Sequence, residues 1–326
     1  MCRLAPTALL AAGIFVIVAA SSVSPQDSVA PLPPPDVRDH PYGPHPRHRL
    51  DLWKARSSQP APLLVNIHFG GFSAGDKSTV DRAFLERCLA SGISVASVNY
   101  RFHRDAPFPA PMLDCGRAVQ HLRHSARPWG LDPSRVGAYG HGVGGGIALW
   151  LAFHPELATP DSADPVARQS TRLAGAVAID AQTSYDPRFL RAHIGGRAHE
   201  HPAGPAFFGL PLEEFATPHA HRRFEEASPY HHASADDPPV LLYYRLPDVA
   251  LAADQGPPGH GIHHPRFGKV LARKLAALDV PCQLVLRPSA ARDFKISDPV
   301  DGPGRNEILG FLACRLVGLV EPGPGR

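Results

Sequence analysis

The chain has 326 residues, of which 44% are hydrophobic and 19% charged, and its formal net charge is +3. This length suits one large α/β domain and does not require a second one. The small net charge, without a dense run of Lys or Arg, argues against a nucleic-acid-binding surface. The 19 His are scattered without HExxH-like spacing, so the sequence predicts no metal site, and no motif indicates a cofactor.

Residues 1–23 have the pattern of a secretory signal peptide. Arg3 is followed by an uncharged apolar stretch over residues 9–20 and by the small residues 19–22. The pattern predicts cleavage near residues 20–24 and export to the periplasm or the cell exterior. An uncleaved membrane anchor is the alternative, although the apolar stretch is short for a transmembrane helix.

The chain contains five cysteines, one of which, Cys2, falls within the predicted signal. Cys88, Cys115, Cys282 and Cys314 remain. Export permits disulfides, but four cysteines allow three pairings and the sequence does not select one. Because the segments around Cys88 and Cys115 are predicted to be helical, where Cys is often a small buried hydrophobe, we expect free thiols.

Residues 24–47 are rich in proline and predict an extended linker without a core of its own. The next residues alternate like a strand, and a single domain is expected over residues 48–320, followed by a tail at 321–326. Strands are predicted at 49–53, 63–68, 93–99, 135–139, 173–179, 239–245 and 282–286, and helices at 81–91, 111–126, 144–154, 265–278 and 306–319. This alternation predicts a mostly parallel central sheet with helices on both faces.

Residues 182–237 interrupt the alternation of strands and helices. They carry clusters of Gly, Pro and His, with weak helical patterns at 186–193 and 212–227. The segment follows a predicted strand, so we expect a cap-like insertion that covers the edge of the sheet and shapes a pocket.

Several short motifs occur in a fixed order within residues 48–320. They are IHFGGF at 67–72, VNYR at 98–101, APFPA at 106–110, WGLDPSRV at 129–136, GHGVG at 140–144 and PPVLLYY at 238–244, with Asp114 and Asp248 after two of them. Together they resemble the esterase/lipase branch of the α/β-hydrolases, close to the hormone-sensitive-lipase and feruloyl-esterase-like carbohydrate esterase groups. The resemblance implies an α/β-hydrolase fold and acyl-transfer chemistry at its active site.

The resemblance implies a sharp turn at residues 140–144, which in this family presents a nucleophilic serine in a G-x-S-x-G pattern. Gly142 occupies the serine position here, and glycine has no side chain that can attack a carbonyl. His141 precedes it, but we expect its side chain to leave the turn in a different direction. Ordinary serine hydrolysis from this turn is therefore not expected.

The base and acid positions of the family follow later in the chain. Alignment places Arg292 at the catalytic histidine, and a guanidinium that stays protonated cannot act as a base. The acid position is kept as Asp248. We expect Asp248 and Arg292 to form an ion pair, which would turn the former charge relay into a structural clamp. His263 and His264 are interpreted as helix-start or surface residues.

The oxyanion loop of the family is kept in part. By the resemblance, Gly70, Gly71 and Val143 offer backbone N–H groups to an oxyanion. Phe69 stands where the family has its first glycine, and its ring either fills the acyl space or packs outward. His68, Phe69 and His141 are the expected pocket residues.

These departures favour an exported protein of the esterase/lipase type that has lost catalysis. It would bind a small-molecule, glycan or ester ligand through the former active site. The first alternative is an active carboxylic-ester hydrolase with a rearranged site, in which Ser73 or Ser289 acts with a nearby histidine. The second is a structural or interaction protein that makes contacts through its proline-rich arm.

Overall fold

The computed structural model describes residues 31–253, 256–289, 295 and 298–318. The chain divides after Leu32, and every element below lies within Pro33–Arg326. The predicted signal peptide and the predicted tail at 321–326 lie outside the described residues. Within the described part of the chain, no helix is both long and apolar enough to cross a membrane.

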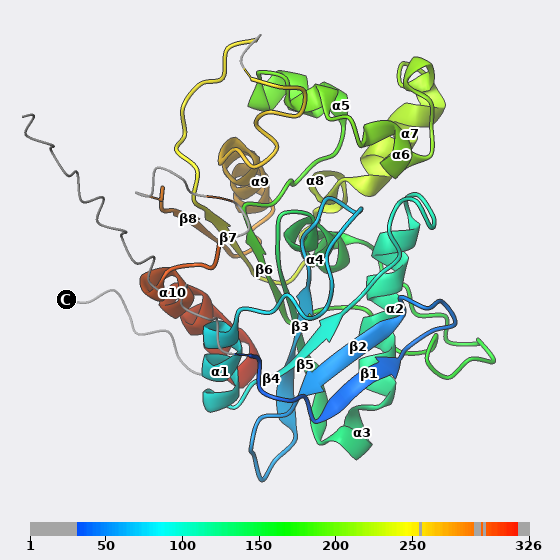
Figure 1. Cartoon of the computed structure of the whole chain (residues 1–326), viewed down its shortest axis with the longest axis vertical. Coiled ribbons are helices and arrows are strands. Elements are labelled where there is room, and N and C mark those ends of the chain that lie inside the picture. The colour runs from blue at the N-terminus through cyan, green and yellow to red at the C-terminus, as the bar shows by residue number, and fades with distance from the viewer. Residues whose placement is uncertain (1–30, 254–255, 290–294, 296–297, 319–326) are drawn as a thin grey trace, which may run out of the picture. The chain divides into compact units, whose positions relative to one another are not determined.

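An eight-stranded sheet forms the centre of the fold (Figure 1), with the strand order β1-β2-β4-β3-β5-β6-β7-β8. The strands are β1 (Val37–Pro41), β2 (Arg49–Trp53), β3 (Ala61–Ile67), β4 (Ser94–Val98), β5 (Leu131–His141), β6 (Gly175–Ile179), β7 (Val240–Tyr244) and β8 (Cys282–Leu286). The β1–β2 and β2–β4 pairs are antiparallel, and all the others are parallel. The predicted α/β-hydrolase fold, with its mostly parallel sheet, is confirmed.

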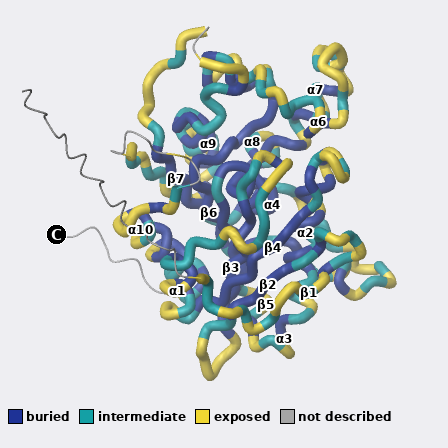
Figure 2. The backbone as a smooth tube through the Cα atoms, viewed as in Figure 1, coloured by how far each residue is buried: buried dark blue, intermediate teal, exposed yellow. Residues whose placement is uncertain are grey.

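Helices cover both faces of the sheet because successive strand residues point to opposite sides. In β7, Tyr243 lies against Gly304 of α10 and Tyr244 lies against Gly268 of α9. One face carries α1 (Arg82–Ala90), α10 (Gly302–Leu312) and the following π-helix η4 (Ala313–Val317), and the other carries α2 (Ala110–His124), α4 (Val143–Phe153) and α9 (Arg266–Ala277). The short helix α3 (Ala126–Trp129) leads into β5. The inner strands β3, β4, β6 and β7 are entirely buried between these layers, whereas the edge strands β1 and β8 are partly exposed (Figure 2).

The predicted linker over residues 24–47 is too long at its carboxyl end. Val37–Pro41 forms β1, with His40 opposite Leu50 and Pro41 opposite Arg49. An edge strand tolerates proline because one side of it has no partner strand that requires its N–H groups. The prediction was wrong for residues 37–41 because the surrounding prolines concealed a short edge strand.

Residues 182–237 connect β6 to β7 through short helices, as expected of a cap-like segment. These are α5 (Pro187–Phe189), η1 (Leu190–Ile194), η2 (Ala198–Glu200), α6 (Gly204–Phe208), η3 (Leu212–Glu214), α7 (Pro218–Ala227) and α8 (Pro229–His232). Aromatic side chains hold the segment together: Phe208 packs edge-on against Phe224, with ring centroids 4.6 Å apart, and Phe207 stacks on Phe72, with centroids 4.3 Å apart. The segment is thereby anchored to the loop after β3.

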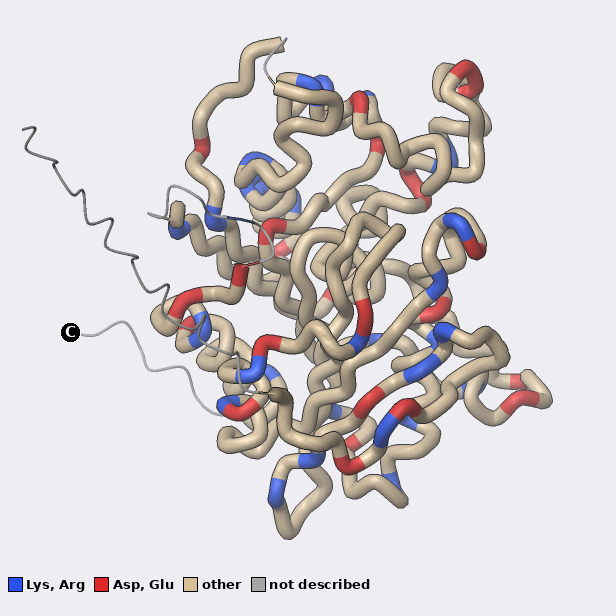
Figure 3. Tube along the Cα trace, viewed as in Figure 1, with Lys and Arg blue, Asp and Glu red and all other residues tan. Residues whose placement is uncertain are grey.

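Charged residues of both signs are interspersed along the described chain (Figure 3). Cys88, Cys115, Cys282 and Cys314 are free cysteines, and the first two are buried in the helical layers.

Helix α4 is the central element of the fold, and all of its residues are buried. Its first turn passes so close to the neighbouring strands that a side chain does not fit. A Cβ on Gly144 would lie 2.1 Å from the carbonyl oxygen of Ile67 in β3, and one on Gly140 would lie 2.3 Å from the carbonyl carbon of Gly144. The glycines at 140 and 144 are therefore required by backbone contact, whatever the chemistry of the turn.

We predict that Gly144→Ala lowers the free energy of unfolding by about 1–3 kcal/mol or more, because backbone rather than a flexible side chain blocks the new methyl group. Urea unfolding measures the change. The matched control is Gly310→Ala in α10, where a Cβ meets nothing within 4 Å. This control should stabilise the protein by about 0.5–1 kcal/mol, since alanine is the better helix former. Equal stability of Gly144→Ala and the unmodified chain would contradict the prediction.

Candidate functional site

The turn between β5 and α4 has, at Gly142, a backbone conformation that glycine adopts readily. Gly142 has φ 51° and ψ −120°, a conformation that residues with a side chain rarely adopt. Its N–H donates to the carbonyl of Ile179 in β6 at 2.9 Å, and its carbonyl accepts from Gly146 in α4. The turn is therefore held by backbone hydrogen bonds on both sides and does not depend on a reactive side chain.

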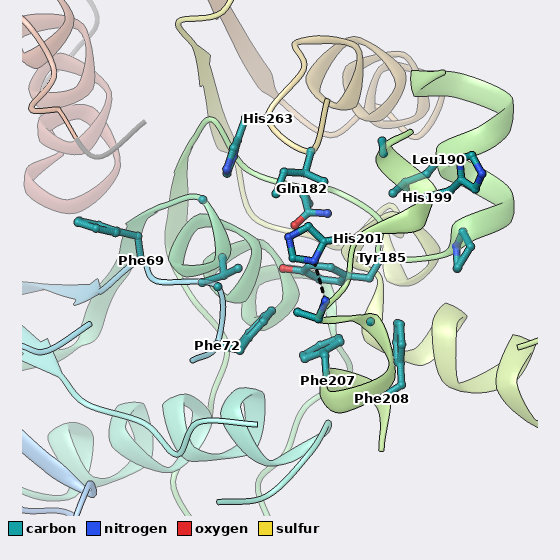
Figure 4. Close-up of a pocket in the computed structure, with 18 of the residues that line it drawn as sticks. Phe69, Phe72, Gln182, Tyr185, Leu190, His199, His201, Phe207, Phe208 and His263 are labelled. Atoms are coloured by element: carbon teal, nitrogen blue, oxygen red, sulfur yellow. Dashed lines mark hydrogen bonds between the residues drawn. The ribbon is translucent and has the colours of Figure 1, made fainter. Parts of the chain in front are cut away.

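A cavity of about 160 Å³ opens above this turn (Figure 4). Gly142 and Val143 form one side of it, and the cap-like segment supplies much of the remainder. Its aromatic wall consists of Phe69, Phe72, Tyr185, Phe207, Phe208 and Phe215. Its polar side chains are Gln182, His199, His201 and His263. The cavity is thus mainly apolar with a few polar groups, which is typical of small-molecule sites.

His263 lies directly beside Gly142. A Cβ built on Gly142 would lie 3.3 Å from Cε1 of His263. Its Nδ1 is 2.6 Å from the carbonyl oxygen of Asp180, and because a carbonyl only accepts, Nδ1 must carry the proton. Burial lowers the pKa of His263, which favours the neutral ring. The bare nitrogen is therefore Nε2, as a general base requires.

A buried ion pair fixes the carbonyl that orients His263. The Asp180 carboxylate accepts from the Arg245 guanidinium at 2.7 Å and from the Arg245 backbone N–H at 2.8 Å. The Asp180 side chain is 0% exposed, and its backbone has φ 47°. Since the same residue supplies the acceptor for His263, the ion pair holds the imidazole in place.

Backbone donors remain where an oxyanion would lie. The N–H groups of Gly71 and Val143 border the cavity and have no acceptor among the described residues. Val143 opens α4, so its N–H belongs to the positively polarised end of a helix, which attracts carboxylates and oxyanions. Gly70, the third expected donor, does not line the cavity.

The loop that carries Gly71 is held by Tyr100 of the VNYR motif and by His103, which follows the motif. The Tyr100 hydroxyl donates to the carbonyl of His68 at 2.9 Å, and the backbone N–H of His103 donates to the carbonyl of Phe72 at 2.8 Å. These two hydrogen bonds hold the loop on both sides of Gly70 and Gly71. The motif thus has a structural role in shaping the site.

Three polar residues of the segment after β6, His201, Tyr185 and Gln182, line the cavity. The His201 Nδ1 accepts from the N–H of Ala203 at 3.2 Å, so its other ring nitrogen carries the proton (Figure 4). Burial is the main cause that lowers the pKa of His201. The buried Tyr185 hydroxyl has no hydrogen-bond partner within the described part of the chain, although buried hydroxyls normally have one. Gln182 adds an amide.

Asp248 does not reach the turn. It pairs with Lys269, lies 3.6 Å from the Arg266 guanidinium and 3.9 Å from His264, and does not line the cavity. Lys269 holds the pKa of this carboxyl below its usual range. The predicted partner Arg292 lies outside the described residues, so the proposed clamp stays a prediction. The cations that the structure places around Asp248 come from α9 and its start.

Two of the expected pocket residues line a different cavity. His68 and His141 border a neighbouring space of about 180 Å³, and only Phe69 borders both. His141 shares a strand face with Tyr139, whose hydroxyl lies 2.9 Å from its Nε2, and Tyr139 stacks on Phe84 of α1. The face that α1 covers therefore takes His141 away from the Gly142 cavity, so His68 and His141 line the neighbouring space in its place.

The sequence alone does not indicate that His263 lies at this cavity or that Asp180 orients it. Both histidines of the pair at 263–264 lie just before α9, which begins at Arg266, but His264 is only 3% exposed and is not a surface residue. His263 lies in the loop between β7 and α9, whereas the aligned base position, Arg292, follows β8. No local motif in the sequence indicates this. Ser73 and Ser289 do not line the cavity. Among the described residues, the group with metal-ligand spacing lies elsewhere, at His154, Glu226 and His232.

Comparison with known proteins agrees with this geometry. The BD-FAE family model matches residues 50–256, which is more than half of the 326-residue chain. Esterase LipI of Mycobacterium tuberculosis is 33% identical over 92 residues, a stretch that covers 28% of this chain and 29% of LipI. The chain thus matches less than a third of the length of this relative.

Two solved structures share the fold. An acetyl ester-xyloside bifunctional hydrolase from Caldicellulosiruptor lactoaceticus is 23% identical, with a TM-score of 0.58 over 74% of this chain and 78% of its own. A butyrate-bound esterase from Thermogutta terrifontis is 19% identical, with a TM-score of 0.59 over 85% of this chain and 91% of its own. At these identities the likeness establishes the fold alone.

Proposed function

Since the chain belongs to the BD-FAE family of the esterase/lipase-type α/β-hydrolases, we propose that it is an exported member that binds a small ester or carboxylic acid without hydrolysing it. The observation that carries this proposal is the combination at one turn: Gly142 supplies no nucleophile, while the cavity above it and the donors beside it remain. A cavity that kept its shape after losing its reactive group is suited to binding.

The size and lining of the cavity favour a small ligand with an acceptor group. About 150 Å³ is enough space for a benzene-sized molecule, which is close to the volume of this cavity. The aromatic wall suits an acyl chain or ring, and the N–H groups of Gly71 and Val143 suit a carboxylate or ester oxygen. The structural relatives named above include an acetyl-ester hydrolase and an esterase holding butyrate.

An active carboxylic-ester hydrolase is the second candidate, and His263 is the observation that favours it. Its neutral imidazole stands beside position 142, where a general base would stand. His263 alone does not make a catalytic triad, because a triad also needs a nucleophile beside the base. Neither Ser73 nor Ser289 supplies that part at this cavity.

Export rests on the sequence of the first 23 residues. A positive residue, an uncharged apolar stretch and small residues follow one another there, as in a secretory signal. A ligand-binding protein outside the cytoplasm would meet extracellular esters and acids directly.

We predict that butyrate or benzoate binds the purified protein with one site per chain, measured by calorimetry, and that p-nitrophenyl butyrate is not turned over. Gln182→Leu should weaken binding by up to about tenfold, since it removes the amide of a residue that lines the cavity. Gln169→Leu, outside the cavity, is the matched control and should bind normally. Turnover that a serine-directed phosphonate inhibits would overturn the non-catalytic proposal.

We predict that Gly142→Ser gains ester hydrolysis at least about 10²-fold above the unmodified chain, because the new hydroxyl would lie beside the His263 imidazole. The gain should vanish in Gly142→Ser/His263→Gln. Burial lowers the pKa of His263, so the activity should rise with pH through a midpoint below 6.5 and be constant at neutral pH. A gain that survives loss of His263 would contradict its assignment as the base.

Export predicts a shortened mature chain. Expressed with its own amino terminus in a secreting host, the protein should be recovered outside the cytoplasm with its first residue within about residues 21–25, as determined by amino-terminal sequencing. An intact Met1 in the membrane fraction would instead indicate an anchor. An intact Met1 in the cytoplasmic fraction would contradict export.

A further inference from the structure

Three potential metal ligands meet at a corner away from the cavity described above. His154 directly follows α4, Glu226 lies in the last turn of α7, and His232 is the last residue of α8. Their ligand atoms all lie within 4.8 Å of one another, and none of the three lines the cavity. The corner joins the central helix to the carboxyl-terminal part of the cap-like segment.

Backbone carbonyls fix the tautomers of both histidines. Nδ1 of His154 is 2.8 Å from the carbonyl oxygen of Pro155, and Nε2 of His232 is 2.7 Å from the carbonyl oxygen of Glu226. A carbonyl accepts only, so these two nitrogens carry protons. In the neutral rings, Nε2 of His154 and Nδ1 of His232 are bare. Metal-bound histidines show this same arrangement, in which the other ring nitrogen donates to a carbonyl or carboxylate.

The contact between His154 and Glu226 requires a positive charge. The bare Nε2 of His154 lies 3.3 Å from Oε1 of Glu226, so two lone-pair acceptors face each other. Either a proton on His154 or a bound cation resolves the conflict. The separation fits a cation: at Zn–N and Zn–O bonds of about 2.0–2.1 Å, two tetrahedral ligands are about 3.3 Å apart.

A rigid wall positions the three side chains. The Trp150 ring stacks on His154 with centroids 3.9 Å apart and meets His232 edge-on at 6.1 Å. The Trp150 indole also donates to the Glu226 carbonyl at 2.9 Å, so the helix that bears the carboxylate is tied to α4. Trp150 is itself buried, so this wall is part of the core.

We propose that His154, Glu226 and His232 bind one Zn²⁺ ion, which clamps the carboxyl end of α4 to α7 and α8. Two imidazoles and one carboxylate are a ligand set that zinc accepts, with a fourth position left for water. The Glu226 side chain is 54% exposed, so water and the ion reach the corner from solvent. No short motif in the sequence contains these ligands, because His154 and Glu226 are 72 residues apart.

Zinc titration of the full chain tests the proposal. The protein is stripped with a chelator, dialysed and titrated with zinc sulfate at pH 7.5 against a chromophoric competitor. One tight site per chain is expected, and Glu226→Gln should weaken it more than about tenfold, since even changes around metal ligands commonly cost 10–100-fold in affinity. Zinc should also raise the Tm of the unmodified protein and leave that of Glu226→Gln nearly unchanged.

The matched control is Glu225→Gln, which removes the adjacent carboxylate of the same helix, a partner of Arg188. It should bind zinc as the unmodified chain does. Equal affinity in the unmodified chain and Glu226→Gln would overturn the proposal and leave the proton on His154 as the charge at this corner. An equal loss in Glu225→Gln would overturn it as well, because the effect would then reflect net charge. Both variants change exposed or half-exposed carboxylates, so circular dichroism can verify that they fold.

Discussion

The close approach of α4 to the sheet is the constraint on which the rest of the structure depends. Gly140 and Gly144 allow the helix to start against the backbone of β3, and a methyl group at either position would meet backbone atoms. This contact sets the turn at Gly142, places the start of α4 at the wall of the cavity, and fixes where the loop after β3 can lie. The cap-like segment then closes the remaining side through its phenylalanines.

Within that frame, Gly142 stands where the family resemblance implies a nucleophilic serine. The hydroxyl is missing at position 142, yet an imidazole stands beside it, oriented by a carbonyl that a buried ion pair holds. A scaffold can therefore hold an imidazole beside this turn even when the residue at the turn carries no reactive group. Binding needs only the scaffold, the apolar wall and the donors, and all of these are present.

Much of the fold could be predicted from the sequence because its strands are buried on both faces and its helices carry regular apolar spacing. Asp81 and Ser91, the predicted ends of the first helix, are the caps of α1. The vacant nucleophile position was also visible, since local motifs define that turn. The position of the His263 imidazole could not be predicted, because it depends on the path of the long loop between β7 and α9. Likewise, β1 depends on pairing with β2 and leaves little local pattern among prolines.

All residues of α4 are buried, which has a consequence for the turn that precedes it. A helix with no solvent-facing side cannot shift or tilt without disturbing strands and helices around its whole circumference. The unusual φ and ψ at Gly142 are thus maintained by the packing of the core. The packing of the core is therefore enough to preserve this turn, with or without a reactive group at position 142.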